Sequence, residues 1–264
     1  MSKKTVVIGA GINGLVASNY LIRNGHDVTL IEKKETVGGA CAMETFSYQS
    51  QQIQYPSGAS VLGLMQDFVF EETGLSKRLN TFVPYSPKIV YFPNLKGPTY
   101  IYRDSDELDT ELRKKWGESG DTKAFREDES KIIEFIQSGF REARTPCIEE
   151  AKLNLGDDLV SLWITGDAKS LLDHYFDSDF SKMYMAMTVT ESGPVDLTDK
   201  YSAFTIPIMD SGSVFDGYYG FVHEGIWNLT QSLARINSDL GVDIRVSSSL
   251  IGKDLEKQRI LLEK

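Results

Sequence analysis

Residues 6–41 read VVIGAGINGLVASNYLIRNGHDVTLIEKKETVGGAC, and this stretch decides the fold of the chain. The β-branched run Thr5–Ile8 is typical of a strand that is buried on both faces. A glycine-rich turn over residues 9–14 follows, and apolar positions at helical spacing predict a helix over residues 12–24. A second apolar run at 28–31 predicts another strand. This βαβ order indicates a parallel sheet with a right-handed crossover.

Three glycines of the turn, Gly9, Gly11 and Gly14, follow the spacing G-x-G-x-x-G between a strand and a helix. Gly9 permits the tight turn, Gly11 lets a pyrophosphate approach the backbone, and Gly14 allows close packing of helix on strand. The N-terminus of the helix offers free N–H groups and a positive dipole end. Glu32 closes the second strand, where its carboxylate would accept hydrogen bonds from ribose hydroxyls and disfavour the 2′-phosphate of NADP.

FAD and NAD share this pattern, and the residues after Glu32 help to separate them. Lys33 and the pair Gly38-Gly39 follow the second strand within a few residues. This arrangement resembles the extended FAD fingerprint of flavoprotein oxidases and desaturases. The resemblance implies that Gly38 and Gly39 lie against the FAD pyrophosphate and ribityl chain. The cofactor-binding residues expected in this segment are Gly9, Ala10, Gly11, Asn13, Gly14, Glu32, Lys33, Gly38, Gly39 and Ala40.

Two later segments extend the resemblance. FSYQSQQIQYPSGASVLGL, residues 46–64, is similar to the segment that passes the isoalloxazine ring, with Gly58, Ala59 and Ser60 nearest to it. Residues 218–250, YYGFVHEGIWNLTQSLARINSDLGVDIRVSSSL, resemble the return toward adenine, which would meet the backbone of Leu250. Together these segments resemble the N-terminal half of the phytoene-desaturase-like FAD-dependent oxidoreductases. The branch of the pyridine nucleotide-disulfide oxidoreductase domain-containing protein 2 type is the most similar.

This resemblance implies an α/β fold in which a Rossmann-like FAD-binding domain with a βαβ start carries an inserted mixed α+β substrate domain. We expect the first part of the FAD-binding domain over residues 1–65, the insert over 66–214, and the return over 215–264. The implied activity is desaturase- or dehydrogenase-like hydride transfer between a small apolar substrate and the flavin. Because the flavin carries the bond chemistry, no catalytic residue is assigned.

Two departures from the family pattern bear on this expectation. Many members carry Arg after the Gly-Gly pair, where this chain has Ala40-Cys41, so backbone dipoles and Lys33 would hold the pyrophosphate. Relatives also continue to a second FAD motif, which does not follow Ile260 here. We therefore expect an incomplete chain, and a second polypeptide that supplies the missing C-terminal half. The alternatives are a non-catalytic or partner-dependent half-subunit of a split flavoprotein, an NAD-binding dehydrogenase and an amine-oxidase-like enzyme.

Composition excludes several other classes of protein. The 264 residues are 41% apolar and 25% charged, with a formal net charge of −10, which disfavours nucleic-acid binding. No apolar run is long enough for an integral membrane segment, and the short apolar start is no signal peptide, so we expect a cytoplasmic protein. Two distant cysteines and three scattered histidines predict neither a disulfide framework nor a metal site.

The remaining chain carries local signals of both kinds of regular structure. Strand-like runs at 88–92 and 99–102 predict an antiparallel hairpin. Apolar residues at helical spacing from Ile226 to Leu240 predict an amphipathic helix, and the alternation over 242–246 predicts a strand after it. Residues 188–219 are rich in Gly, Pro, Asp and Ser and are expected to be irregular.

Overall fold

The computed structural model describes residues 2–191, 193–254 and 259–263. The chain divides into two compact units. The first unit is built from Met1–Leu62, Asp67–Phe82 and Gly220–Lys264, and the second from Gly63–Gln66 and Val83–Tyr219. The division into an FAD-binding domain and a substrate domain remains a prediction, since compactness alone assigns no function to either unit.

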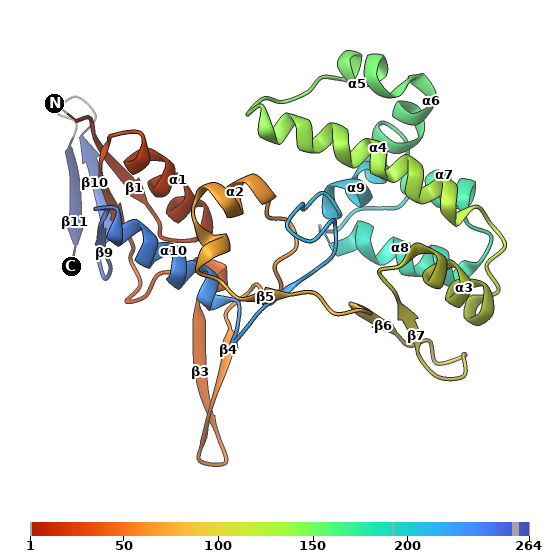
Figure 1. Cartoon of the computed structure of the whole chain (residues 1–264), viewed down its shortest axis with the longest axis horizontal. Helices are drawn as coiled ribbons and strands as arrows, with labels where there is room; N and C mark the ends of the chain where they lie inside the picture. The colour runs from red at the N-terminus through yellow and green to blue at the C-terminus, as the bar shows by residue number, and fades with distance from the viewer. Residues whose placement is uncertain (1, 192, 255–258, 264) are drawn as a thin grey trace. The chain divides into compact units, whose positions relative to one another are not determined.

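A parallel sheet lies at the centre of the first unit. Strands β1 (Lys4–Ile8), β2 (Asp27–Ile31) and β9 (Asp243–Arg245) lie in the order β1-β2-β9, and both pairings are parallel. Helix α1 (Ile12–Arg23) connects β1 to β2, and α10 (Trp227–Asp239) precedes β9 (Figure 1). The predicted Rossmann-like βαβ start is confirmed.

The register between β1 and β2 sorts their side chains into two faces. Val7 pairs with Leu30, and a Cβ on Gly14 of α1 would lie 3.6 Å from a Val7 methyl carbon. Val7 and Leu30 therefore face α1, and Leu30 is completely buried. Val6 and Ile8 point to the opposite face, where 43% and 56% of their surface is exposed. The α1 face of β1 is therefore packed, and its opposite face is exposed at Val6 and Ile8.

Helices α1 and α10 pack against each other through a buried polar contact. The Asn19 side chain donates to Asn237 Oδ1 at 2.8 Å, and Asn237 donates to the Leu15 carbonyl at 2.8 Å. Asn19 Oδ1 accepts from Arg23 Nε at 2.8 Å. Because both asparagines are completely buried, these bonds satisfy groups that water cannot reach.

The described part of the first unit also contains two hairpins, the antiparallel pair of β5 and β8, and three short helical segments, of which η1 spans Gly39–Cys41. The hairpin of β3 and β4 projects as a long two-stranded ribbon (Figure 1) and turns at Gln49 and Ser50, both at positive φ. The sequence did not predict it, because its turn lacks the Asn-Gly or Asp-Gly pair that marks such hairpins. The bounds are β3 Met43–Tyr48, β4 Gln51–Pro56, α2 Asp67–Glu72, η2 Leu75–Lys77, β5 Thr81–Phe82, β8 Phe221–Val222, β10 Ser249–Asp254 and β11 Arg259–Glu263.

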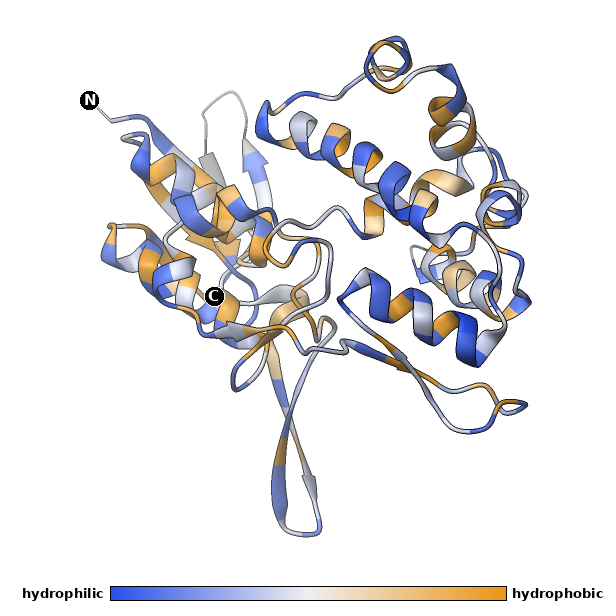
Figure 2. Ribbon diagram, turned by 45° about the vertical axis from the view of Figure 1, so that its right-hand side comes forward, coloured by the Kyte–Doolittle hydropathy of each residue, from blue (hydrophilic) through white to orange (hydrophobic). Residues whose placement is uncertain are grey.

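The second unit is mainly helical, and its core surrounds Trp163. Figure 2 shows that apolar and polar residues form separate stripes along α4. The apolar stripe packs against this core. The Trp163 ring lies tilted against that of Phe125, with 4.9 Å between the ring centroids. Trp163 donates to the Tyr175 hydroxyl at 3.0 Å, and that hydroxyl donates to Asp128 at 2.7 Å. The bounds are β6 Lys88–Val90, β7 Thr99–Ile101, α3 Ser105–Trp116, α4 Thr122–Arg141, α5 Ile148–Leu155, α6 Asp157–Leu159, η3 Val160–Ile164, α7 Ala168–Tyr175, α8 Asp179–Glu191, η4 Ser202–Phe204 and α9 Thr205–Met209.

The predicted hairpin of β6 and β7 is confirmed. The prediction that residues 188–219 are irregular is only partly confirmed. Helix α8 continues to Glu191, and η4 and α9 lie within residues 202–209. Packing against the Trp163 core stabilises these short helices despite the turn-forming composition, since Val189, Ala203 and Ile206 are fully buried in it. Within the described residues, no helix is long and apolar enough to cross a membrane.

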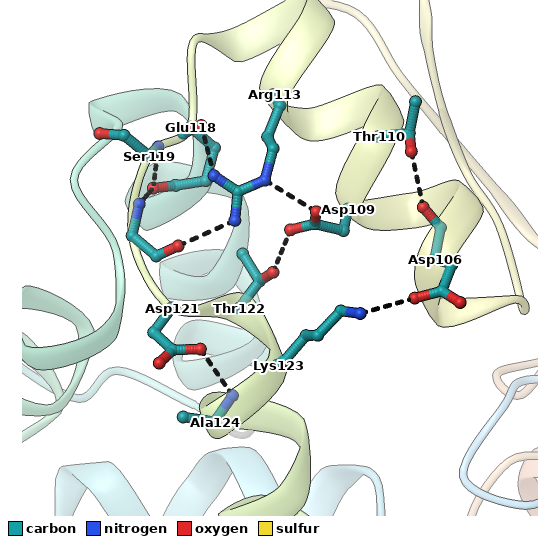
Figure 3. A network of polar contacts seen from close by, with 11 residues as sticks. Asp106, Asp109, Thr110, Arg113, Glu118, Ser119, Asp121, Thr122, Lys123 and Ala124 are labelled. Carbon is teal, nitrogen blue, oxygen red and sulfur yellow. Dashed lines mark hydrogen bonds and ion pairs between the residues drawn. The ribbon is translucent and has the colours of Figure 1, made fainter.

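A polar network fixes the connection between α3 and α4 (Figure 3). Arg113 donates to Asp109 at 2.7 Å and to the Gly120 carbonyl at 3.1 Å, and Asp109 also accepts from the Thr122 hydroxyl. Glu118 accepts from the backbone N–H groups of Ser119 and Gly120 at 3.0 and 2.8 Å. These bonds satisfy the backbone of the turn between the two helices.

Candidate functional site

The glycine turn connects β1 to α1 and leaves the helix N-terminus accessible. Gly9 has a φ of +94° and donates to the Ile31 carbonyl at 2.7 Å, so the turn starts next to the end of β2. Gly11 is the N-cap of α1, and no described side chain caps this end of the helix. The first N–H groups of α1 therefore remain available for an acceptor such as a phosphate oxygen.

The other two glycines of the turn differ in what surrounds them. A Cβ on Gly14 would lie 1.9 Å from the Gly9 carbonyl oxygen, so only glycine fits where α1 crosses the turn. A Cβ on Gly11 would meet Gly39 Cα at 3.8 Å, an ordinary contact. The missing side chain at Gly11 therefore leaves open space that the fold itself does not require.

Glu32 joins the turn to the end of β2. Its carboxylate accepts from the Ala10 N–H at 2.8 Å and from the Lys34 N–H at 2.9 Å, and 8% of the residue is exposed. These bonds fix the orientation of the carboxylate, and each oxygen keeps a further lone pair. A ribose hydroxyl that approached the same edge could donate to that lone pair.

The Gly-Gly segment lies directly beside the glycine turn. Gly38 donates to the Ala10 carbonyl at 2.8 Å, and Gly11 and Gly38 form a parallel bridge. A Cβ on Gly39 would come within 3.0 Å of Gly11 Cα, which shows how closely the two backbones approach. The structure thus brings together the two glycine motifs that the sequence separates by more than twenty residues.

The segment after β4 joins the same assembly through its backbone. Ala59 donates to the Ala40 carbonyl at 2.8 Å, and a Cβ on Gly58 would lie 3.3 Å from that carbonyl oxygen. The Ser57 hydroxyl donates to the Gly39 carbonyl at 3.0 Å. Gly58 and Ala59 therefore lie beside the Gly-Gly segment, whereas Ser60 makes no hydrogen bond to a described residue.

The segment that leads to Leu250 is hydrogen-bonded to the backbone of Glu32. Glu32 donates its N–H to the Arg245 carbonyl at 2.8 Å and accepts from the Ser248 N–H at 2.9 Å through its own carbonyl. Leu250 lies two residues further, in β10, with 37% of its surface exposed. The backbone near Leu250 is thus hydrogen-bonded to the end of β2, but among the described residues no hydrogen bond joins Leu250 itself to the glycine turn.

Three predicted binding residues near the glycine turn and the Gly-Gly segment are exposed. Asn13 is exposed on the first turn of α1, and Lys33 is exposed directly after Glu32. Ala40 is exposed as well and occupies the position where many family members carry Arg. Lys33 is therefore free to approach a bound diphosphate, while Ala40 contributes only backbone.

Sequence reasoning missed two residues of this assembly. Ser57 bonds the Gly-Gly segment, and Lys34 supplies an N–H to Glu32 and a carbonyl that accepts from Ser247 at 2.9 Å. Neither residue belongs to a recognisable sequence motif. Lys34 takes part through its backbone, which any residue could supply, and a single serine can form hydrogen bonds in many settings. Only the tertiary structure could reveal these contacts.

Cys41 and His223 are two further residues whose side chains could carry chemistry. Cys41 is buried, and burial raises the pKa of its thiol, which favours an unreactive side chain. His223 lies on the surface with its ring 4.7 Å from that of Phe82, and its N–H donates to the Asn80 carbonyl at 3.0 Å. These contacts fit the interpretation of a loop histidine bonded to backbone.

The geometry of the assembly fits the diphosphate of a dinucleotide. The space above Gly11 is open, the N-terminus of α1 is uncapped by any described side chain, and Glu32 is oriented nearby by two backbone donors. A diphosphate needs backbone donors and close approach, and a ribose needs an acceptor. The donor and acceptor types present here meet both needs.

Comparison with known proteins agrees with this geometry. Residues 7–68 match the family model described as NAD(P)-binding Rossmann-like domain. A 4,4′-diapophytoene desaturase (4,4′-diaponeurosporene-forming) of Staphylococcus haemolyticus is 26% identical over 256 residues, which cover 92% of this chain and 48% of that protein. The predicted resemblance to the phytoene-desaturase-like Rossmann oxidoreductases is confirmed. It spans about half the length of the curated relatives that it matches.

Solved structures extend the likeness of the fold. Cyclohexylamine oxidase from Brevibacterium oxydans matches with a TM-score of 0.52 and 15% identity, covering 99% of this chain and 56% of that one. A Rab GDI of Plasmodium falciparum matches with a TM-score of 0.54 and 11% identity, covering 98% of this chain and 62% of that one. At these identities the likeness shows the fold alone, and the function must be argued from the site.

Proposed function

We propose that this chain is the FAD-binding half of a flavoprotein oxidoreductase that transfers a hydride between an apolar substrate and the flavin. The observation that carries the proposal is the convergence of the uncapped α1 N-terminus, the Gly38-Gly39 segment and the oriented Glu32 carboxylate. These groups would bind the diphosphate and the adjoining ribose. When bound, the flavin of FAD supplies the acceptor for a hydride from a C–H bond.

In this proposal the chain's own residues bind and orient the cofactor. The N–H groups at the start of α1 would donate to the diphosphate, and the Glu32 carboxylate would accept from the ribose. Backbone at Gly39 and Ala59 would lie along the remainder of the cofactor. No side chain of the described residues is assigned a proton transfer.

FAD is favoured over NAD by the segments that lie beside the glycine turn. The contacts of Gly38 with Ala10 and of Ala59 with Ala40 extend the site well beyond the βαβ unit. A dinucleotide whose second half is long, like the ribityl chain and ring system of FAD, would use this extension. The similarity to the desaturase named above supports an apolar, unsaturated substrate. This part of the proposal rests on that similarity alone.

The test measures binding of the cofactor before any turnover. Purified protein is titrated with FAD and, in parallel, with NAD, by calorimetry and by the visible spectrum of the bound flavin. We expect FAD to bind at least about tenfold more tightly than NAD, which corresponds to about 1.4 kcal/mol. Preferential binding of NAD, or the failure of FAD to bind to the chain with or without a complementary polypeptide, would refute the proposal.

A second candidate function, a partner-dependent half-subunit, is favoured by the free edge of β1. Within the described residues β1 pairs with β2 alone, although its sequence is that of a strand buried on both faces. Val6 and Ile8 expose 43% and 56% of their surface on the face opposite α1. Parallel sheets are normally covered on both faces and seldom expose such an edge. We propose that a polypeptide carrying the second half of the family fold covers this strand.

This candidate is tested with the protein produced alone and together with a polypeptide that carries the second half of a family member. We expect the two to co-purify, and Ile8→Glu to abolish the complex because a charge would be buried at the interface. Leu153→Glu, at a residue of α5 that is 89% exposed, is the matched control. Substrate turnover by the isolated chain, or an undiminished complex with Ile8→Glu, would rule out this role.

A further inference from the structure

The second unit contains a cavity of about 270 Å³ that neither the glycine turn nor Glu32 touches. Residues of β6, α4, α8 and the loop that follows α9 line it. Its volume is just below the range of about 300–1,000 Å³ that drug-sized ligands occupy, so it suits a small metabolite. The charged and aromatic side chains that matter here are Lys88, Glu129, Tyr184, Asp210 and Tyr219.

A cation faces this cavity without an acidic partner. The Lys88 ammonium lies 4.7 Å from the centre of the Tyr219 ring and 5.8 Å from that of Tyr184. No carboxylate in the described part of the chain lies within ion-pair distance of it. The aromatic faces attract the ammonium, but they offer it no hydrogen-bond acceptor of full charge.

Three carboxylates line the same cavity, Glu129, Asp210 and Asp216, and the Arg126 side chain lines it as well. Glu129 is 3% exposed; one of its oxygens accepts from Arg126 at 2.5 Å, and the other is buried without a partner among the described residues. The Asp210 side chain makes no hydrogen bond to any described residue. Burial and the nearby Glu129 raise the pKa of Asp210 to about 7, against the opposing charges of Arg126 and Lys88.

These unpaired charges define what could occupy the cavity. Burying a charged group without a partner is unfavourable, and here groups of both signs are left unpaired. Glu129 already has an ion pair with Arg126, so Lys88 and Asp210 are left without a partner among the described residues. An anion alone would satisfy Lys88 and leave Asp210 unpaired, and a cation alone would satisfy Asp210 and leave Lys88 unpaired. A molecule that carries both charges a few atoms apart would satisfy both groups at once.

We propose that this cavity binds a small zwitterion, an α-amino acid, with its carboxylate on Lys88 and its ammonium on Asp210. The rings of Tyr184 and Tyr219 would pack against the rest of the ligand. The inference goes beyond the proposed function, because it involves the second unit alone and requires no flavin. Failure of one test therefore leaves the other untouched.

The first experiment uses the unmodified protein, so that it does not depend on the folding of variants. The twenty standard L-amino acids are screened by their effect on thermal unfolding, and the best is titrated by calorimetry. It is then compared with its decarboxylated amine and its deaminated carboxylic acid. We expect each analogue to bind at least about tenfold more weakly, because each leaves one charge of the cavity unpaired. The absence of amino-acid binding, or equal binding of the amine, would overturn the proposal.

The second experiment tests whether the amino acid binds in this cavity and not elsewhere on the protein. Lys88→Met should weaken binding of the amino acid at least about tenfold and leave binding of the amine unchanged. Asp210→Asn should weaken both the amino acid and the amine. Lys96→Met and Asp158→Asn, at exposed positions outside the cavity, are the matched controls. Circular dichroism verifies that each variant is folded, and unchanged affinity in both folded cavity variants would refute the assignment.

Discussion

The Glu32 carboxylate accepts a hydrogen bond from the backbone N–H of Ala10 at 2.8 Å. The residue expected to bind ribose therefore also fixes the glycine turn that is expected to bind the diphosphate. One side chain thus couples the two halves of the proposed site, so that a change at Glu32 should disturb both.

Glu32→Gln tests this coupling. The amide can accept through one oxygen only, so its NH₂ group would face one of the two backbone donors that Glu32 now satisfies. We expect the free energy of unfolding to fall by about 1–3 kcal/mol and the affinity for FAD to fall with it. Urea unfolding and FAD titration measure the two effects. Glu35→Gln, at an exposed position, should change neither, and a stable Glu32→Gln protein with undiminished FAD binding would contradict the coupling.

Alanine substitutions at Gly11 and Gly14 should separate binding from folding. At Gly11 the new Cβ meets Gly39 Cα at 3.8 Å, so the fold should keep its stability while the methyl group occupies the space for the diphosphate. At Gly14 the new Cβ would overlap the Gly9 carbonyl oxygen at 1.9 Å, so the protein should unfold more easily. Thermal unfolding and FAD affinity are measured for both. Unchanged FAD affinity in Gly11→Ala would remove the structural basis of the proposed function.

The buried pair of asparagines should couple α1 to α10. Asn19→Ala leaves Asn237 and Arg23 with unsatisfied groups, at a cost of about 1–3 kcal/mol in the free energy of unfolding. The double variant with Asn237→Ala should cost less than the sum of the two single changes, because the partner is removed as well. Chemical unfolding of the four proteins gives the coupling energy. Ser238→Ala, exposed on α10, serves as the control, and strict additivity would show that the bond contributes nothing.

The polar network between α3 and α4 should make the stability of the protein depend on pH. We expect stability to fall when the solution is acidified. The hydrogen bond from Arg113 holds the pKa of Asp109 below its usual value, and the bond from Thr122 acts in the same sense. A lowered pKa in the folded state stabilises the fold above the unfolded value of about 3.9, and this contribution is lost as the pH falls through the folded value. Unfolding temperatures between pH 7 and pH 3 should therefore drop less steeply in Asp109→Asn than in the unmodified protein. An identical pH profile for the two would exclude this contribution, and Asp158→Asn provides the reference for an exposed aspartate.

The sequence predicted those parts of the fold in which local pattern and packing agree. The βαβ unit, α10 and the hairpin of β6 and β7 were all predicted within a few residues, because their apolar periodicity matches the faces that they bury. The glycine spacing likewise predicted the turn at Gly9 and the tight crossing at Gly14. These are the positions where backbone geometry alone dictates the residue type.

The sequence could not predict contacts that depend on tertiary structure. The Gln49-Ser50 turn adopts positive φ without glycine, so its hairpin carried no recognisable signal. The hydrogen bond from Ser57 to Gly39 and the cavity around Lys88 and Asp210 join residues that are distant in sequence and follow no spacing rule. Such features become visible only when the chain is folded.

The pairing of Thr81 with Val222 and of Phe82 with Phe221 has a practical consequence for engineering. Apart from the short segment Gly63–Gln66, the chain leaves the first unit after Phe82 and re-enters it at Gly220, so this exit and this entry lie side by side on neighbouring strands. Residues 83–219 are thus a cassette whose two ends could be bridged by a short turn. Excising this cassette would give a minimal form of the first unit, into which foreign inserts could be grafted at the same junction.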